Sequence, residues 1–231
     1  METEMKKLRT YWDYLTQDGH TYQMGAQSHR VWLLDLLKEK GVKSLLDIGC
    51  GTGPIYQLIR DTNLDGNPVT HEGEEKRWTF KYKGTDYSDG MIDVCKKEFP
   101  EADFEVQDAR KQLEKDNSWD CVLVMHCLDH LDDYQAAINE SARVAKKYVL
   151  IVLWRGINYN EGAVNNLNNR NRYGLEDNQP DWEDTHLQDF AWEPLKKAFD
   201  EAGLKIVLKE DGQEVNKEGR YNTVILLEKK N

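Results

Sequence analysis

The chain has 231 residues, of which 39% are hydrophobic, and this is enough for a single α/β domain with a buried core. Its formal net charge of −11 disfavours nucleic acid as a partner, because tight, sequence-independent binding to DNA or RNA needs clustered Lys and Arg. No apolar stretch is long enough to span a bilayer and residues 1–7 lack a signal-peptide core, so we expect a cytoplasmic protein with no membrane partner. The four cysteines form no C-x-x-C pair, which fits inert thiols in a reducing cytosol.

The predicted elements alternate between strands and helices along most of the chain. In chain order, we expect a helix over 23–40, a strand over 45–48, a helix over 55–60, a strand over 80–85, a helix over 91–99, strands over 104–107 and 119–125, a helix over 131–145 and a strand over 148–154. A helix over 192–202 and two strands, over 204–210 and 221–227, complete the chain. This order predicts an open, mostly parallel seven-stranded sheet with helices on both faces and an antiparallel C-terminal edge hairpin.

The sequence predicts one domain, 1–231, because it shows neither an internal repeat nor a linker. Two segments interrupt the alternation of elements. Residues 61–77 are polar and contain Gly and Pro, so we expect an inserted loop or small hairpin there. Residues 156–185 are rich in Asn, Gly and Asp, and loops of this length are usually functional lids or disordered.

The most informative segment is 45–54, LLDIGCGTGP, in which a buried-type apolar run meets an acid and then three glycines at alternate positions. Glycine tolerates a sharp strand-to-helix turn and lets a ligand approach the main chain closely. Asp47 works against a phosphate ligand, which prefers free N–H groups and a positive helix end, so a cationic or amino-bearing ligand is the better fit. The third glycine is misplaced for a dinucleotide fingerprint, and Pro54 stands where a P-loop would carry lysine.

This turn resembles motif I of the class I S-adenosylmethionine-dependent methyltransferases, whose ligand carries a sulfonium and an ammonium group. The segments 84–91, 104–109 and 119–131 resemble three further blocks of that family, and Glu140 with Arg143-Val144 resembles the helix before its fifth strand. The resemblance implies a Rossmann-like fold, S-adenosyl-L-methionine as cofactor and S-adenosyl-L-homocysteine as product. It also implies that residues 1–40 form an N-terminal helical lid. We expect residues 156–185 to cap the acceptor side, with a variable surface loop as an equal alternative.

The resemblance also assigns roles to residues at the ends of the predicted strands. It implies that Asp86 accepts hydrogen bonds from both ribose hydroxyls and that Asp108 accepts one from the adenine amino group. Tyr87 would pack on the adenine ring, although an ordinary core aromatic is an equal alternative. The implied cofactor-binding residues are Asp47, Gly49, Cys50, Gly51, Gly53, Asp86, Tyr87, Met91, Asp108, Ala109, Met125, His126 and Tyr22.

Two features depart from the family pattern. The spacing between Asp47 and Asp86 is about twice the usual ~20 residues, and the insertion at 61–77 accounts for the difference. The segment 146–148, Lys-Lys-Tyr, stands where relatives show a Gly-Gly turn. We expect the insertion to lie at the rim of the ligand site and the segment 146–148 to alter only a turn.

Methyl transfer from a sulfonium is an in-line displacement, so the protein mainly aligns the acceptor and excludes water. A general base matters where the acceptor carries a proton. The catalytic candidates are His126, at the exit of the fourth strand, and His186, before the helix expected over 192–202. A structural or orienting role is the alternative for each. His126, Asp129 and His130 also have the spacing of metal ligands, but no further ligand cluster accompanies them in the sequence and we expect no metal.

A small molecule is the expected acceptor, with transfer to oxygen or nitrogen. Residues 124–127, VMHC, stand where amino-DNA methyltransferases carry an Asp/Asn-Pro-Pro-Tyr run, and the chain has no Pro-Cys dipeptide for C5-cytosine chemistry. RNA or protein remains an alternative acceptor. An aminopropyltransferase-like enzyme on the same fold and a non-catalytic S-adenosylmethionine-binding module are the alternative functions, and the sequence leaves the oligomeric state open.

Overall fold

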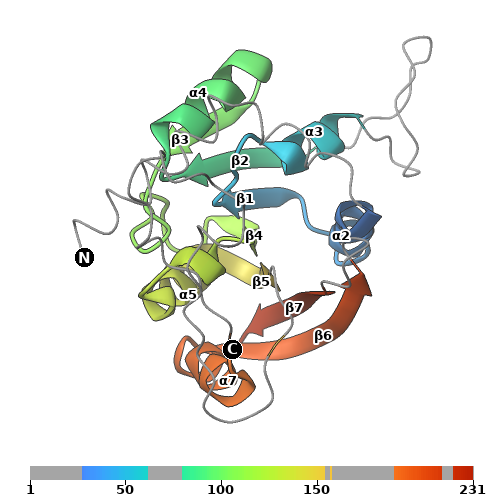
Figure 1. The fold of residues 1–231 in the computed structure, drawn as a ribbon, viewed down its shortest axis with the longest axis vertical. Helices are drawn as coiled ribbons and strands as arrows, with labels where there is room; N and C mark the ends of the chain where they lie inside the picture. Colours follow the sequence, from blue (N-terminus) through green and yellow to red (C-terminus); the bar gives the residue numbers. More distant parts are fainter. Residues whose placement is uncertain (1–27, 62–79, 154–156, 158–189, 215–220, 231) are drawn as a thin grey trace, which may run out of the picture.

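The computed structural model describes residues 28–61, 80–153, 157, 190–214 and 221–230. Seven strands form one sheet in the order β3-β2-β1-β4-β5-β7-β6 (Figure 1). The strands are β1 Ser44–Ile48, β2 Lys81–Asp86, β3 Asp103–Val106, β4 Trp119–Met125, β5 Ala145–Leu153, β6 Leu204–Glu214 and β7 Tyr221–Lys229. β1 to β5 pair in parallel, whereas β7 runs antiparallel to both β5 and β6. The predicted open, mostly parallel seven-stranded sheet with an antiparallel C-terminal hairpin is therefore confirmed.

Helices cover both faces of this sheet, as predicted. They are α2 Ser28–Glu39, α3 Pro54–Asp61, α4 Asp89–Glu98, α5 Tyr134–Val144 and α7 Trp192–Glu201, with a 3₁₀ turn, η2, at Leu128–His130. Buried residues of α2, α3 and α4 form one hydrophobic cluster with the sheet, and those of α5 and α7 form the other. The described part of the chain is thus a three-layer α/β/α arrangement (Figure 1).

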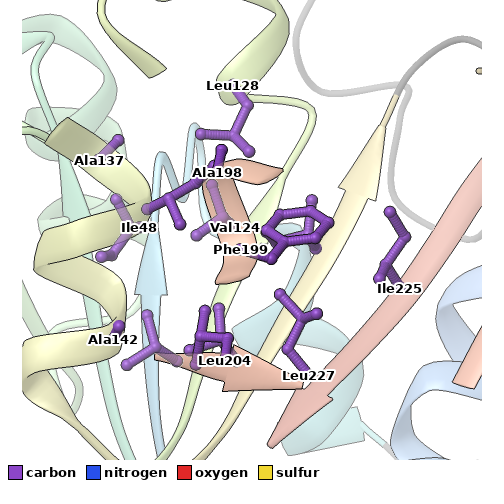
Figure 2. Packing of buried hydrophobic residues seen from close by; sticks show 14 of the residues in the cluster. Ile48, Val124, Leu128, Ala137, Ala142, Ala198, Phe199, Leu204, Ile225 and Leu227 are labelled. Atoms are coloured by element: carbon purple, nitrogen blue, oxygen red, sulfur yellow. The ribbon is translucent and has the colours of Figure 1, made fainter. Parts of the chain in front are cut away.

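The strand sequences explain how the two clusters are built. Successive side chains of a strand point to opposite faces, so Leu46 and Ile48 of β1 join the cluster of α5 and α7 while Leu45 joins that of α2, α3 and α4. β4 is buried along nearly its whole length, as expected for a central parallel strand. Figure 2 shows the cluster of α5 and α7, with Ile48, Val124, Leu128, Ala137, Ala142, Ala198, Phe199, Leu204, Ile225 and Leu227 labelled.

Three predicted boundaries were wrong in ways that bear on the site. β3 ends at Val106 and not at Gln107, so Asp108 lies two residues beyond the strand. The helix expected from Leu131 begins at Tyr134, because the side chain of Asp133 caps it by accepting a hydrogen bond from the Ala136 N–H at 3.0 Å. β6 continues past the predicted residue 210 to Glu214, through two irregularities in its register with β7.

The N-terminal lid predicted for 1–40 is described only from residue 28 onward. The insertion at 61–77 and the cap at 156–185 lie outside the described residues, apart from Asp61 and Ile157. Within the described residues, no helix has both the length and the apolar composition needed to cross a bilayer.

Candidate functional site

The candidate site lies at the carboxyl ends of β1, β2 and β4. The strand order reverses between β1 and β4, and open α/β sheets bind their ligands at such a switch point. The chain leaves β1 through the glycine turn, which we define as residues 49–53, and enters α3 at Pro54. Gly49, Gly51 and Gly53 all have positive φ, at 73°, 56° and 79°, so the turn requires the conformational freedom of glycine at each alternate position.

Three N–H groups of the glycine turn bond the end of β2. Gly49 and Cys50 donate to the carbonyl oxygen of Thr85 at 2.7 and 3.0 Å, and Gly51 donates to Oδ2 of Asp86 at 2.9 Å. A phosphate-binding loop keeps such groups free for the ligand. The hydrogen bonds of the turn therefore agree with the sequence argument that this loop is not a phosphate cradle.

The three glycines differ in what surrounds them. A Cβ on Gly49 would stand 2.6 Å from Cβ of Cys127, and one on Gly53 would stand 3.0 Å from the ring of Phe99. No atom of the described residues lies within 4 Å of the corresponding position on Gly51, apart from its neighbours in the chain. Gly51 is thus the point at which a ligand can approach the main chain, and this opening fits a cofactor lying across the turn.

Asp86, the last residue of β2, is held rigidly beside that opening. Its Oδ2 accepts the N–H of Gly51 and its Oδ1 accepts the N–H of Ser88, both at 2.9 Å. Ser88 in turn caps α4 by accepting from the Met91 N–H at 3.0 Å. The carboxylate of the partly exposed Asp86 is thereby oriented through both of its oxygens at this edge of the sheet.

Asp47, whose role towards the cofactor stays a prediction, is fixed inside the protein. It lies within β1, is 1% exposed, and accepts a hydrogen bond at 2.7 Å from the hydroxyl of Tyr82 on β2. Burial and the charge of Asp47 raise the pKa of the Tyr82 hydroxyl well above its usual value, so the tyrosine stays protonated and donates. The hydrogen bond joins β1 to β2 inside the protein, and nothing in the sequence pattern identifies Tyr82 as the partner of Asp47.

Asp108 is engaged by an arginine that the sequence analysis missed. Its Oδ1 accepts from the backbone N–H of Arg110 at 2.8 Å and from Nε at 3.1 Å, and its Oδ2 accepts from Nη2 at 2.9 Å. Nη1 of Arg110 also bonds Oδ1 of Asp132 at 3.2 Å. The hydrogen bond to Asp108 raises the pKa of the arginine, which keeps its charge. Arg110 thereby ties the segment after β3 to the segment after β4.

Cys127, which is partly buried after the end of β4, lies within electrostatic reach of several acids. Burial of its sulfur raises the pKa of the thiol strongly, and the charges of nearby carboxylates raise it further. These carboxylates belong to Asp86, Asp129, Asp108 and Asp47. Because Cys127 packs directly against Gly49, the same negative field covers the glycine turn. A cation is attracted by such a field and an anion is repelled.

His126 lies at the end of β4, between Met125 and Cys127, and adopts a left-handed backbone with φ of 52°. Its N–H donates to the carbonyl of Val152 at 2.8 Å, which continues the pairing of β4 with β5. Non-glycine residues with positive φ are uncommon and concentrate at functional sites. His126 is partly exposed. Because it directly follows β4, it lies at the same edge of the sheet as Asp86 and the glycine turn.

The remaining predicted residues separate into three groups. Met91, Ala109, Met125 and Cys50 are buried, at 2%, 7%, 8% and 4% exposure, whereas Tyr87 is partly exposed. Tyr22 and His186 lie outside the described residues, so their roles stay predictions. Among the described residues, no group of three or more His, Cys, Asp or Glu side chains could hold a metal ion.

The comparisons with known proteins agree with this geometry. Residues 20–209 match the family model described as "Methyltransferase domain". The chain is 26% identical over 121 residues to the ubiquinone/menaquinone biosynthesis C-methyltransferase UbiE of Campylobacter jejuni, covering 52% of this chain and 47% of that protein. It is 31% identical over 164 residues to the tRNA N(3)-methylcytidine methyltransferase trm140 of Schizosaccharomyces pombe, covering 62% of this chain and 47% of that protein.

Solved structures show the same fold. The Burkholderia thailandensis 1,6-didemethyltoxoflavin-N1-methyltransferase, with bound 1,6-didemethyltoxoflavin and S-adenosylhomocysteine, superposes with a TM-score of 0.67 at 14% identity, over 98% of this chain and 88% of its own. The chain spans about half the length of the curated relatives it matches. The family match covers most of the chain, and the chain belongs to the methyltransferase-domain family of class I S-adenosylmethionine-dependent methyltransferases.

Proposed function

We propose that this protein transfers a methyl group from S-adenosyl-L-methionine to a nitrogen or oxygen atom of a small molecule. The observation that carries the proposal is the position of Asp86, whose carboxylate is fixed by the N–H groups of Gly51 and Ser88 beside the open side of the glycine turn. The field of carboxylates around Cys127 supports a cationic ligand there. Bound S-adenosyl-L-methionine would supply a methyl group already activated on a positively charged sulfur.

The residues that would hold the cofactor follow from the site. We expect Asp86 to accept from the pair of ribose hydroxyls, because a carboxylate has two acceptor oxygens and both are oriented here by backbone N–H groups. Asp108 already accepts three hydrogen bonds from Arg110 and has room for a fourth, which suits the adenine amino group. Gly51 allows the cofactor to lie close to the main chain. Asp47 would act indirectly, by fixing the turn through Tyr82.

His126 is the proposed acceptor-side residue. It directly follows β4 with a left-handed backbone, and an imidazole at this position could take a proton from the acceptor or orient it. The protein's part in the reaction is then to align the acceptor and to exclude water, since the methyl group needs no further activation. His186 remains the second proposed catalytic residue, on sequence grounds alone.

A small molecule is favoured over RNA as the acceptor by the net charge of −11. The relatives leave both classes open, because trm140 is named a tRNA methyltransferase whereas UbiE and the toxoflavin enzyme are named for small-molecule biosynthesis. UbiE is moreover named a C-methyltransferase, so a carbon acceptor belongs in any screen. The net charge is a bias against RNA, and on this basis we propose a small molecule.

Two measurements test the proposed function. Calorimetric titration with S-adenosylmethionine and S-adenosylhomocysteine should show binding of both, and failure of both at high micromolar concentration would reject the proposal. A turnover screen that detects S-adenosylhomocysteine release should then compare a panel of hydroxylated and amino aromatic compounds with bulk tRNA. Release with tRNA alone would replace the small-molecule acceptor by RNA, and binding without release in either panel would indicate a non-catalytic module. Radiolabelled decarboxylated cofactor would reveal aminopropyl transfer.

A further inference from the structure

A buried glutamine, Gln112, links the two segments that carry the proposed cofactor-binding carboxylates. The residue is 5% exposed and lies between β3 and β4. Its Nε2 donates to the carbonyl oxygen of Asp108 at 2.8 Å, and its Oε1 accepts from the hydroxyl of Thr85 at 3.3 Å. Thr85 is fully buried and directly precedes Asp86. One amide group therefore joins the end of β2 to the segment after β3 that carries Asp108, which we call the adenine-side segment.

The main chain of Gln112 is fixed as firmly as its side chain. Its N–H donates to Oε2 of Glu140 at 2.9 Å, and its carbonyl oxygen accepts from Nη2 of Arg143 at 3.0 Å. Glu140 and Arg143 lie one turn apart on α5 and bond each other at 2.7 and 2.8 Å. The main chain of Gln112 is thus fixed to α5, a helix of the core. Gln112 can therefore act as a rigid support for the groups that its side chain bonds.

Thr85 connects this support to the glycine turn. Its hydroxyl bonds Gln112, while its carbonyl oxygen accepts the N–H groups of Gly49 and Cys50. The adenine-side segment, the end of β2 and the glycine turn therefore meet at Thr85 through hydrogen bonds that are buried. Buried hydrogen bonds resist small displacements because a displaced polar group loses its partner away from water.

We propose that Gln112 is a positioning residue that sets Asp108 against Asp86 and so determines the selectivity of the site for adenine. This inference rests on the roles of Asp86 and Asp108 in the proposed function. The carbonyl of Asp108 is anchored by the Gln112 amide, and its carboxylate is oriented by Arg110. Loss of the Gln112 amide would let the segment that carries Asp108 shift, and the hydrogen bond to the adenine amino group would lengthen.

The test compares S-adenosylhomocysteine with S-inosylhomocysteine, in which the adenine amino group is replaced by a carbonyl oxygen. The ratio of the two dissociation constants, measured by calorimetry, reports the hydrogen bond to the amino group and is insensitive to a general loss of folded protein. Gln112→Leu should lower the preference for the adenosyl ligand by on the order of tenfold, the effect of one well-placed hydrogen bond. Thermal melting monitors folding of each variant.

Gln107→Leu is the matched control. Gln107 is also 5% exposed and lies in the same segment, but its side chain bonds Glu105 and the N–H of Leu113 and has no bond to Asp108. This variant should lose stability and keep the ligand preference of the wild type. An equal loss of preference in Gln107→Leu and Gln112→Leu would show a general response of the segment to damage, and would overturn the specific role of Gln112.

Two further variants separate failure of this inference from failure of the proposed function. Asp108→Ala should abolish the preference; an unchanged preference would remove the adenine role of Asp108, and the role of Gln112 with it. If Asp108→Ala abolishes the preference but Gln112→Leu does not, the inference about Gln112 is wrong and the proposed function stands. Should Gln112→Leu fail to fold, Thr85→Val, which removes only the hydroxyl donor, should lower the preference in the same direction, and an unchanged preference would overturn the inference.

Discussion

Oδ2 of Asp86 accepts the backbone N–H of Gly51 at 2.9 Å, across 35 residues of sequence. The hydrogen bond ties the end of β2 to Gly51, the one glycine of the turn whose Cβ position is clear of other described residues. The N–H groups of Gly51 and Ser88 thus hold both oxygens of the carboxylate. An acid held in this way is pre-organised to bind hydroxyl groups, since little conformational entropy remains to be lost.

Asp86→Ala is expected to weaken the binding of S-adenosylhomocysteine by ~1–3 kcal/mol, because a polar ligand group then loses its partner. Calorimetry measures the effect directly. Asp93→Ala serves as control, because Asp93 is an exposed acid on α4 and the substitution changes the net charge equally. Similar losses in both variants would mean that general electrostatics, and not a specific contact at Asp86, governs binding.

Tyr82→Phe should destabilise the fold by ~1–3 kcal/mol, because it removes the 2.7 Å hydrogen bond to the buried carboxylate of Asp47. Burial raises the pKa of Tyr82 in the folded protein, so its stabilisation is complete below the unfolded pKa of ~10 and is lost as pH rises towards the higher folded value. The difference in unfolding free energy between wild type and Tyr82→Phe should therefore shrink above pH ~10. Urea unfolding at several pH values measures it.

Tyr56→Phe is the matched control for this experiment. The hydroxyl of Tyr56 donates to the exposed Glu101 at 3.0 Å, and burial raises its pKa to about 12. Because this hydrogen bond lies near solvent, Tyr56→Phe should cost less stability than Tyr82→Phe at neutral pH. Equal losses would contradict the idea that the Tyr82 hydroxyl serves a buried charge.

Much of the fold could be predicted because its signals are local. The apolar runs of β1 and β4 indicate central, buried strands without reference to the rest of the chain. The start of α5 could not be predicted from the same pattern. Leu131 continues the helical spacing of apolar residues, but the cap provided by Asp133 and the preceding 3₁₀ turn determine where the helix begins.

The candidate site could be predicted only where a residue's neighbours in the sequence indicate its role. Asp86, followed by a helix-capping serine, carries such a signal. The bond between Tyr82 and Asp47 depends on the register of β1 against β2, and the bond between Gln112 and Thr85 depends on the path of the chain after β3. Hydrophobic spacing indicates neither the strand register nor the path of a loop. The supporting residues Tyr82 and Gln112 could therefore not be predicted from the sequence.

His126→Asn should keep the fold and the binding of S-adenosylhomocysteine, because asparagine also tolerates the left-handed backbone found at this position. If His126 contacts the acceptor, turnover with the acceptor identified by the release screen should fall at least tenfold. His126→Val is the backbone control, since a β-branched residue with positive φ should cost ~1–2 kcal/mol of stability. Full turnover in His126→Asn would assign the histidine a structural role.

Two alanine substitutions in the glycine turn, at Gly51 and at Gly49, should separate an effect on cofactor binding from an effect on stability. Gly51→Ala adds a methyl group into the space expected to hold the cofactor, and its positive φ costs ~1–2 kcal/mol of stability. We therefore expect a modest fall in melting temperature and a loss of S-adenosylhomocysteine binding too large for the stability change to explain.

Gly49→Ala introduces the same methyl group and nearly the same backbone strain at the opposite side of the turn. Its Cβ would stand 2.6 Å from Cβ and 2.7 Å from Sγ of Cys127, so the turn or the segment after β4 must shift. We expect a larger loss of stability than in Gly51→Ala, measured by urea unfolding, because the clash adds to the strain. If Gly51→Ala binds S-adenosylhomocysteine as tightly as the wild type, the open side of the turn is not where the cofactor lies, and the proposed site is wrong.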